Sequence, residues 1–134
     1  MKSTFYHLQV NIDYTNIAFY KELMAMLGWN VIFEDKAVAG FKSEGMDIWF
    51  TASKSNIKPD YDEIGINHLS FKVKEQDEVD IIRIGLEKMG VQMLFETPRH
   101  RPEFSAGNDQ TYYQIMFATP DNILMEVVYT GIKK

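Results

Sequence analysis

Apolar and polar positions alternate along two stretches of the chain, residues 4–12 and 66–74. This two-residue period is typical of a β-strand that buries one face. The polar face of the first stretch carries His7, Gln9 and Asn11, and the polar face of the second carries His68 and Ser70. Because the opposite face of each stretch is apolar and can pack on a core, each predicted strand presents its histidine on the polar side.

Two further stretches have apolar residues at helical spacing. The first follows the capping side chains of residues 13–16 and ends near Leu27, where Gly28 supplies a stop. The second runs from about Asp77 to Met89 and ends at Gly90. Short apolar runs predict the remaining strands, at residues 31–34, 38–42, 46–52, 91–95, 112–118 and 123–129. Residues 96–111 form a long loop of the kind that often binds ligands.

The order strand, helix and three strands occurs twice. His7 and His68 lie 61 residues apart, and Gly28 and Gly90 lie 62 residues apart, so the two halves repeat in register. We predict a first βαβββ module over residues 1–53, a polar linker over 54–64 and a second βαβββ module over 65–134. Because neither half can bury a sheet alone, the halves should share a core.

Composition narrows the class of protein. An apolar fraction of 46% with 18 aromatic residues excludes a disordered chain. The net charge of −5 argues against a nucleic-acid binder, and the absence of cysteine removes thiolate ligands and disulfides. No run approaches the roughly 18 apolar residues of a membrane span, and no apolar signal core opens the chain. We therefore expect a cytoplasmic protein without membrane or nucleic-acid partners.

Two motifs give the chain a family resemblance. Residues 17–29 (IAFYKELMAMLGW) are similar to the "FYxxxLG" helix of the vicinal oxygen chelate superfamily, and residues 112–127 (YYQIMFATPDNILMEV) are similar to its closing "DPDGxxxEV" hairpin. Thr119 and Asn122 replace the usual Asp and Gly. This superfamily includes glyoxalase I, fosfomycin-resistance thiol transferases, extradiol dioxygenases and bleomycin-resistance proteins. The resemblance implies an α+β fold in which two βαβββ modules form a curved eight-stranded mixed sheet, or cup, with helices outside, and a homodimer.

The resemblance also implies a divalent metal site. His7, His68 and Glu126 match the family's ligand positions, whereas Trp49 stands at the fourth position and cannot ligate a metal. Two imidazoles and one carboxylate suit Zn, Ni, Mn or Fe. Glu126 interrupts an apolar strand, and a buried carboxylate without a partner costs several kcal/mol, so a cation would supply that partner.

Several other residues are candidates for contact with a ligand. Gln9 and Ser70 share the histidine-bearing faces, and Trp49 would form an aromatic wall. One of the paired residues Tyr112 and Tyr113 must face the cup, and we choose Tyr113. In the long loop, Arg99 or Arg101 could hold an anionic group, whereas His100 is expected to be a solvated loop residue.

These features support a metal-dependent enzyme with lyase, isomerase or dioxygenase chemistry. The ion would act as a Lewis acid on a small substrate that chelates it through oxygen atoms. Trp49 argues against ordinary glyoxalase I chemistry, because that enzyme uses a fourth ligand. The alternative is a non-catalytic protein of the bleomycin-resistance kind that sequesters an aromatic ligand against Trp49. Thiol transfer to an antibiotic is a third alternative.

Overall fold

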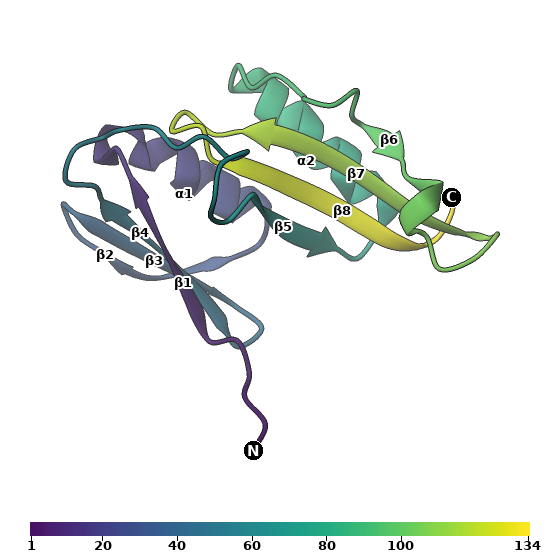
Figure 1. Ribbon diagram of the computed structural model, residues 1–134, viewed down its shortest axis with the longest axis horizontal. Helices are drawn as coiled ribbons and strands as arrows, with labels where there is room; N and C mark the ends of the chain where they lie inside the picture. The colour runs from purple at the N-terminus through teal and green to yellow at the C-terminus, as the bar shows by residue number, and fades with distance from the viewer. The chain divides into compact units, whose positions relative to one another are not determined.

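The computed structural model describes residues 1–134 and separates into two compact units, Met1–Lys58 and Pro59–Lys134. We call them module one and module two. The boundary between them lies inside the segment assigned to a linker from the sequence. The ladders of backbone hydrogen bonds stay within each module, so the eight strands form two four-stranded sheets (Figure 1).

Module one is a βαβββ unit, as predicted. Its elements in chain order are β1 (His7–Ile12), the 3-10 helix η1 (Tyr14–Asn16), α1 (Ile17–Met26), β2 (Asn30–Glu34), β3 (Val38–Ser43) and β4 (Met46–Ala52). The strand order in the sheet is β1-β4-β3-β2. β1 runs parallel to β4, and the other neighbours are antiparallel.

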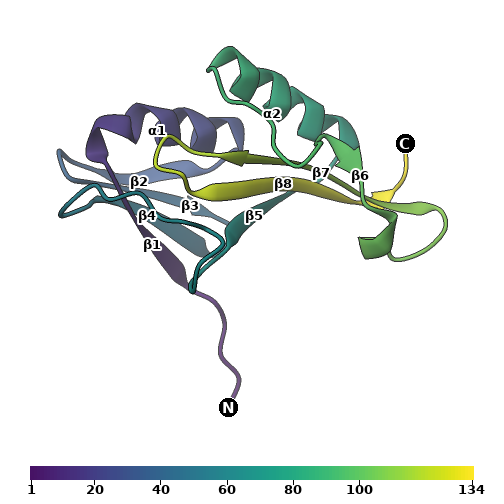
Figure 2. The same cartoon turned by 45° about the horizontal axis from the view of Figure 1, so that its top comes forward.

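The start and end of α1 follow from local chemistry. The Asp13 carboxylate accepts a hydrogen bond from the backbone N–H of Thr15 at 3.1 Å and begins η1, and Gly28 ends the helix with a φ of +77°. Tyr20 packs on Phe50 of β4 with ring centroids 4.6 Å apart, so α1 covers one face of the sheet (Figure 2). The face away from α1 is left for His7, Gln9 and Trp49.

Module two repeats the same order. Its elements are β5 (His68–Val73), α2 (Gln76–Lys88), β6 (Arg99–His100), the 3-10 helix η2 (Pro102–Phe104), β7 (Gln110–Ala118) and β8 (Leu124–Ile132). The strand order is β5-β8-β7-β6, with β5 parallel to β8. The strand pairing reproduces the repeat closely, because Gln9 pairs with Trp49 in module one and Ser70 pairs with Glu126 in module two.

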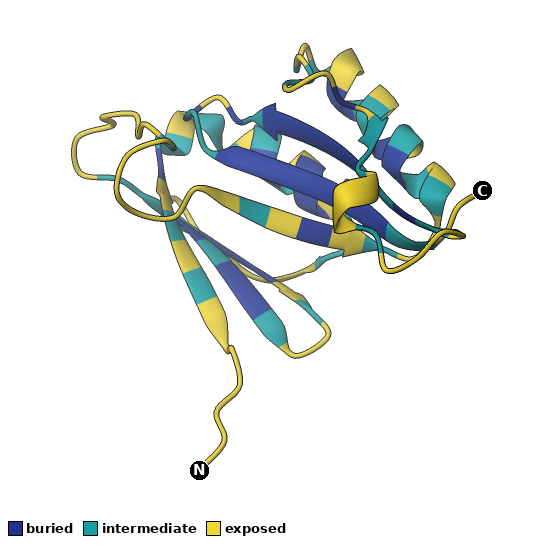
Figure 3. Ribbon diagram, turned by 45° about the vertical axis from the view of Figure 1, so that its right-hand side comes forward, coloured by how far each residue is buried: buried dark blue, intermediate teal, exposed yellow.

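The core of module two lies between α2 and the central strands. A capping box formed by Glu75 and Glu78 begins α2, and its apolar face buries Val79, Ile82 and Leu86. β7 and β8 are buried over most of their length, and Figure 3 shows both as mostly dark blue ribbons. Burial on both faces explains why Ile123–Tyr129 has an apolar run instead of an alternating pattern.

One predicted strand is wrong. Residues 91–95 make only an isolated bridge from Met93 to Phe117, and the edge strand of module two is β6, inside the predicted loop. The reason is that Phe95 and Glu96 adopt the left-handed conformation, with φ of 55° and 59°, which interrupts an extended strand. The chain re-enters the sheet only after Pro98.

Candidate functional site

Module two contains a cavity of about 560 Å³, a volume typical of small-molecule sites. Its polar lining comes from Tyr61, Asp62, Asn67, His68, Arg101, Tyr112, Gln114 and Glu126. Phe95, Phe104, Met116 and Leu124 supply apolar surface. These residues come from β5, β7, β8 and the segment before β7, so the fold of module two alone assembles the cavity.

Glu126 is the centre of the hydrogen-bond network in this cavity. It is only 3% exposed, yet three side chains donate hydrogen bonds to its carboxylate. Ser70 Oγ lies 2.5 Å from Oε1, Tyr112 Oη lies 2.9 Å from Oε1 and 3.1 Å from Oε2, and Gln114 Nε2 donates to Oε2. Hydrogen bonds to a charged group are each worth about 1.5–3 kcal/mol, so neutral donors offset much of the desolvation of this carboxylate.

The sequence led us to expect that the buried Glu126 needs a cation as its partner. The structure corrects this expectation, because protein donors already satisfy the carboxylate. A metal would therefore compete with these donors, Tyr112 in particular, for the carboxylate lone pairs.

Tyr112 stays a hydrogen-bond donor over the whole physiological pH range. Burial, followed by the hydrogen bond to Glu126 and its negative charge, raises the pKa of Tyr112 to about 12. The phenol edge also contacts the Phe104 ring at a centroid distance of 5.4 Å. Tyr112 is thus a protonated, positioned hydroxyl at the wall of the cavity.

The neighbouring asparagine orients the His68 ring. Asn67 Nδ2 donates to the backbone carbonyl of Tyr61 at 2.8 Å, which leaves Asn67 Oδ1 as the acceptor that faces His68 Nδ1, also at 2.8 Å. His68 Nδ1 therefore carries the proton in the neutral ring, and Nε2 keeps its lone pair. That lone pair can bind a metal ion or accept a proton from a ligand.

Arg101 brings a positive charge to the same cavity. Its Nη1 donates to Gln114 Oε1 at 3.0 Å, and the guanidinium carbon lies 4.7 Å from the centroid of the Phe104 ring. Gln114 is 2% exposed, accepts this bond and donates another to Glu126. A continuous chain of hydrogen bonds therefore joins Arg101 to the carboxylate.

The polar face of module one is arranged differently. The Trp49 ring lies across Gly40, where an added Cβ would be 2.6 Å from the ring, and Phe33 flanks it at 6.1 Å between ring centroids. Asp47 is paired with His7 in the β1–β4 ladder and is 5% exposed, and its Oδ1 has no hydrogen-bond partner. Lys42 Nζ lies 3.6 Å from that oxygen. This acidic residue was not singled out in the sequence.

Comparison with known proteins gives matches at the level of structure. No protein-family model matches the sequence, and no curated protein is similar to it at a significant level. Three solved structures illustrate the likeness. A candidate glyoxalase from Bacillus halodurans is 22% identical with a TM-score of 0.79, and the match covers 96% of each chain. A glyoxalase/bleomycin resistance protein from Albidiferax ferrireducens is 17% identical with a TM-score of 0.72, covering 95% of this chain and 99% of that one. The fosfomycin resistance protein FosX from Listeria monocytogenes, complexed with Mn(II) and sulfate, is 22% identical with a TM-score of 0.67, covering 96% and 91%.

The chain has the glyoxalase-type fold. The fold expected from the sequence, two βαβββ modules, is thereby confirmed. No helix in it has the length and apolar composition needed to cross a membrane.

Within the glyoxalase-type fold, module two brings together two of the three predicted metal ligands. His68 and Glu126 line one cavity, and Ser70 donates to Glu126. His7 lies on the polar face of module one, beside Gln9, which donates to Asn11. Neither module by itself gathers three His, Asp or Glu side chains that could hold a metal ion.

Two predicted contact residues lie elsewhere. Tyr113 donates to Asp80 of α2 at 3.0 Å, and Tyr112 takes the place beside Glu126. The β7–β8 register explains this, because Met116 pairs with Glu126 and puts the even-numbered residues of β7 on the Glu126 face. Arg99 makes an ion pair with Glu96 at 3.7 Å, whereas Arg101 lines the cavity.

Proposed function

We propose that this chain is a metal-dependent enzyme with the glyoxalase-type fold that acts on a small molecule bound in the module-two cavity. The observation that carries the proposal is that His68 and Glu126 line the same cavity, and that the Nε2 lone pair of His68 is available to a ligand. These are the donor types that divalent Mn, Fe, Ni and Zn accept. His7 is proposed as the third ligand.

The chemistry of these donors fits a divalent ion. The ion, when bound, would serve as a Lewis acid towards oxygen atoms of the substrate. The similarity to FosX, which was solved with Mn(II), supports this choice. A mutant of the same FosX was solved with Mn(II) and 1S,2S-dihydroxypropylphosphonic acid.

The other residues of the cavity would bind and orient the substrate. Tyr112 keeps its proton and would donate a hydrogen bond to a substrate oxygen on which negative charge develops, in exchange for its bond to Glu126. Arg101 would attract the anionic part of a substrate, and the Phe104 ring beside it would contact an apolar part. Water exclusion by these side chains would strengthen both interactions.

Metal binding by defined variants tests the proposal. The purified chain should bind one Mn(II) per monomer, measured by the loss of the free-ion electron paramagnetic resonance signal. His68→Ala and Glu126→Gln should weaken binding at least tenfold, and His7→Ala should do the same. The matched control is His100→Ala, which removes the third histidine of the chain but touches neither cavity ligand. Equal affinity in all four variants would refute the proposed ligand set.

A second function is favoured by the satisfied state of Glu126. Three protein donors already satisfy the Glu126 carboxylate, so the cavity does not require a cation. The cavity can therefore also act as a binding site without turnover, in the manner predicted for a bleomycin-resistance type of protein. In that case an aromatic ligand should bind in the absence of metal, measured by isothermal titration calorimetry, and Phe104→Ala, which removes an aromatic side chain from the cavity wall, should weaken the binding. Metal-dependent turnover with no metal-free binding would exclude this alternative.

A further inference from the structure

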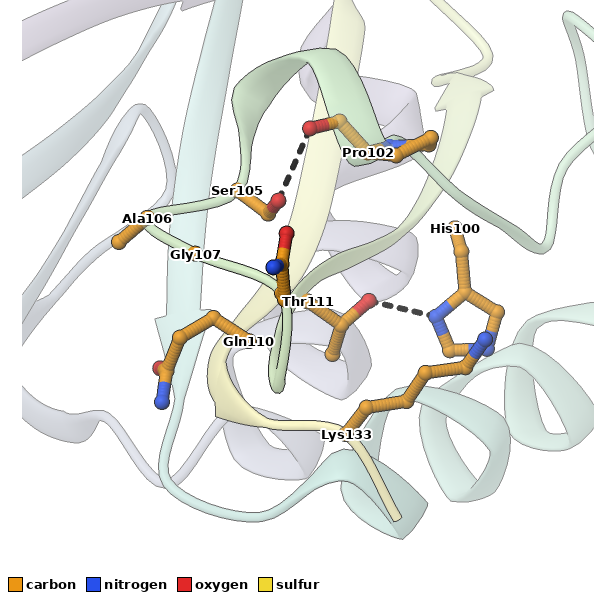
Figure 4. Close-up of a pocket in the computed structure, with 9 residues that line it drawn as sticks. His100, Pro102, Ser105, Ala106, Gly107, Gln110, Thr111 and Lys133 are labelled. Carbon is orange, nitrogen blue, oxygen red and sulfur yellow. Dashed lines mark hydrogen bonds between the residues drawn. The ribbon is translucent and has the colours of Figure 1, made fainter.

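A second cavity of about 520 Å³ lies in module two, on the α2 side of β7. Its polar lining is formed by His100, Ser105, Asn108, Gln110, Thr111 and Lys133, and it contains no acidic side chain (Figure 4). This is notable in a chain with 19 acidic residues and a net charge of −5. The only charged or titratable groups on the wall are a lysine and a histidine.

The His100 ring is held firmly at this wall. Its Nδ1 lies 2.5 Å from Oγ1 of Thr111, a residue only 4% exposed, and the ring packs on that of Tyr113 at a centroid distance of 4.6 Å and a tilt of 34°. Tyr113 is fixed in turn by its bond to Asp80. With Nδ1 engaged by the threonine, Nε2 is the nitrogen left for a ligand.

Lys133 completes the wall and has no ion-pair partner. Its backbone N–H donates to the carbonyl of Asp109 at 2.9 Å, which anchors the residue, and Figure 4 shows its side chain extending toward the His100 ring. The neighbouring Lys134, in contrast, is paired with Glu75. Two basic side chains thus meet at one cavity with no carboxylate on its wall.

The charges around His100 act in opposite directions. Burial and then the positive charge of Lys133 lower the pKa of His100, and Asp80 acts against them. Asp80 is already engaged, because its Oδ1 accepts from Tyr113 and lies 3.4 Å from Arg83 Nε. Tyr113, whose pKa is raised to about 12, stays neutral. An anion placed between Lys133 and His100 would relieve the repulsion between them and favour the protonated ring.

We propose that this second cavity binds an oxyanion group of the phosphate type, held by Lys133 Nζ and by Nε2–H of protonated His100, with side-chain amide donors from Asn108 and Gln110. The volume leaves room for a small organic molecule that carries the anionic group. The site is separate from the Glu126 cavity, because the two cavities share no lining residue. The proposal does not rest on the metal-dependent function.

Nuclear magnetic resonance of the three histidines tests the proposal with inorganic phosphate as the probe. The pKa of His100 should rise by about half a unit in phosphate relative to sodium chloride of the same ionic strength, which corresponds to roughly threefold tighter binding to the protonated ring. The signals of His7 and His68 should follow ionic strength alone. Phosphate affinity should increase as the pH falls through the His100 pKa.

Matched lysine variants separate a built site from general attraction. Lys133→Gln should weaken phosphate binding at least threefold, and Lys134→Gln, which changes the adjacent, paired lysine, should leave it within a factor of about 1.5. His100→Gln should remove the pH dependence. Equal effects of the two lysine variants, or a His100 pKa that responds to chloride as much as to phosphate, would overturn the proposal. Both lysines are exposed, so neither variant should impair folding.

Discussion

The hydrogen-bond chain from Arg101 through Gln114 to Glu126 makes a sharp prediction about stability. We expect Gln114→Leu to destabilise the protein by about 2 kcal/mol, even though leucine fills a similar volume. The side chain of Gln114 is 2% exposed and makes two bonds, one from its Nε2 to the Glu126 carboxylate and one from Arg101 Nη1 to its Oε1. Loss of a hydrogen bond to a buried charge costs about 1.5–3 kcal/mol, and the added burial of a leucine returns only part of that.

A double-mutant cycle isolates the interaction. In a Glu126→Leu background the carboxylate is gone, and Gln114→Leu should then cost less than about 1 kcal/mol, because replacing both partners by apolar groups leaves no unsatisfied charge. Urea unfolding followed by circular dichroism supplies the four free energies of unfolding. The control is Gln9→Leu, which replaces an exposed glutamine whose side chain donates to Asn11 and should change stability by no more than about 0.5 kcal/mol. A coupling energy below about 0.5 kcal/mol would refute the central role given to this network.

Four further predictions follow from other contacts. Asn67→Ala should release His68 Nδ1 and shift the neutral ring toward a mixture of tautomers, visible in the nitrogen-15 chemical shifts of His68, and should weaken Mn(II) binding about tenfold or more. Gly40→Ala should destabilise the protein by about 1–3 kcal/mol in thermal unfolding, because the new Cβ would lie 2.6 Å from the Trp49 ring. Stability should fall as the pH rises from about 10 to about 12: the pKa of Tyr112 and of Tyr113 is raised to about 12, so the unfolded state loses these protons first, and Tyr112→Phe or Tyr113→Phe should each flatten the alkaline limb of the stability curve. Asp47→Asn should cost less than about 1 kcal/mol in urea unfolding, since Asp47 Oδ1 has no hydrogen bond to lose and its ion pair with the half-exposed Lys42 is weak, whereas Glu126→Gln should cost about 1–3 kcal/mol.

Much of the fold could be predicted because local periodicity and the repeat agree with each other. Residues 38–42 and 46–52 were expected as strands, and the structure has β3 and β4 over Val38–Ser43 and Met46–Ala52. The predicted equivalence of Trp49 and Glu126 reappears in the strand pairing, opposite Gln9 and Ser70. The edge strand β6 was missed because two residues in succession, Phe95 and Glu96, adopt a positive φ that no pattern of hydrophobicity indicates.

The site was predicted less completely, since it depends on register and on side-chain partners. Glu126 and His68, which the family resemblance and the repeat single out, both line the module-two cavity, and their role as ligands stays a prediction. The choice between Tyr112 and Tyr113 required the β7–β8 register, and a shift of one residue exchanges the two faces. The roles of Asn67 and Gln114 could not be anticipated, because an amide signals its function only through the atoms that it contacts.

The two modules solve the problem of an acidic residue on the polar face of a sheet in different ways. In module two, a serine, a tyrosine and a glutamine donate hydrogen bonds that stabilise the charge of Glu126. Another partner can bind the carboxylate only if one of these donors moves away. In module one, Asp47 has a half-exposed lysine 3.6 Å away and an oxygen without a hydrogen bond. A cation that reaches Asp47 Oδ1 would displace the Lys42 ion pair but no hydrogen bond, whereas a cation that reaches Glu126 must displace a hydrogen bond. If metal binds through Glu126, Tyr112 is therefore the group whose bond is exchanged, because it alone shares its hydroxyl between both carboxylate oxygens and lies at the cavity wall, where a substrate oxygen can accept it in return.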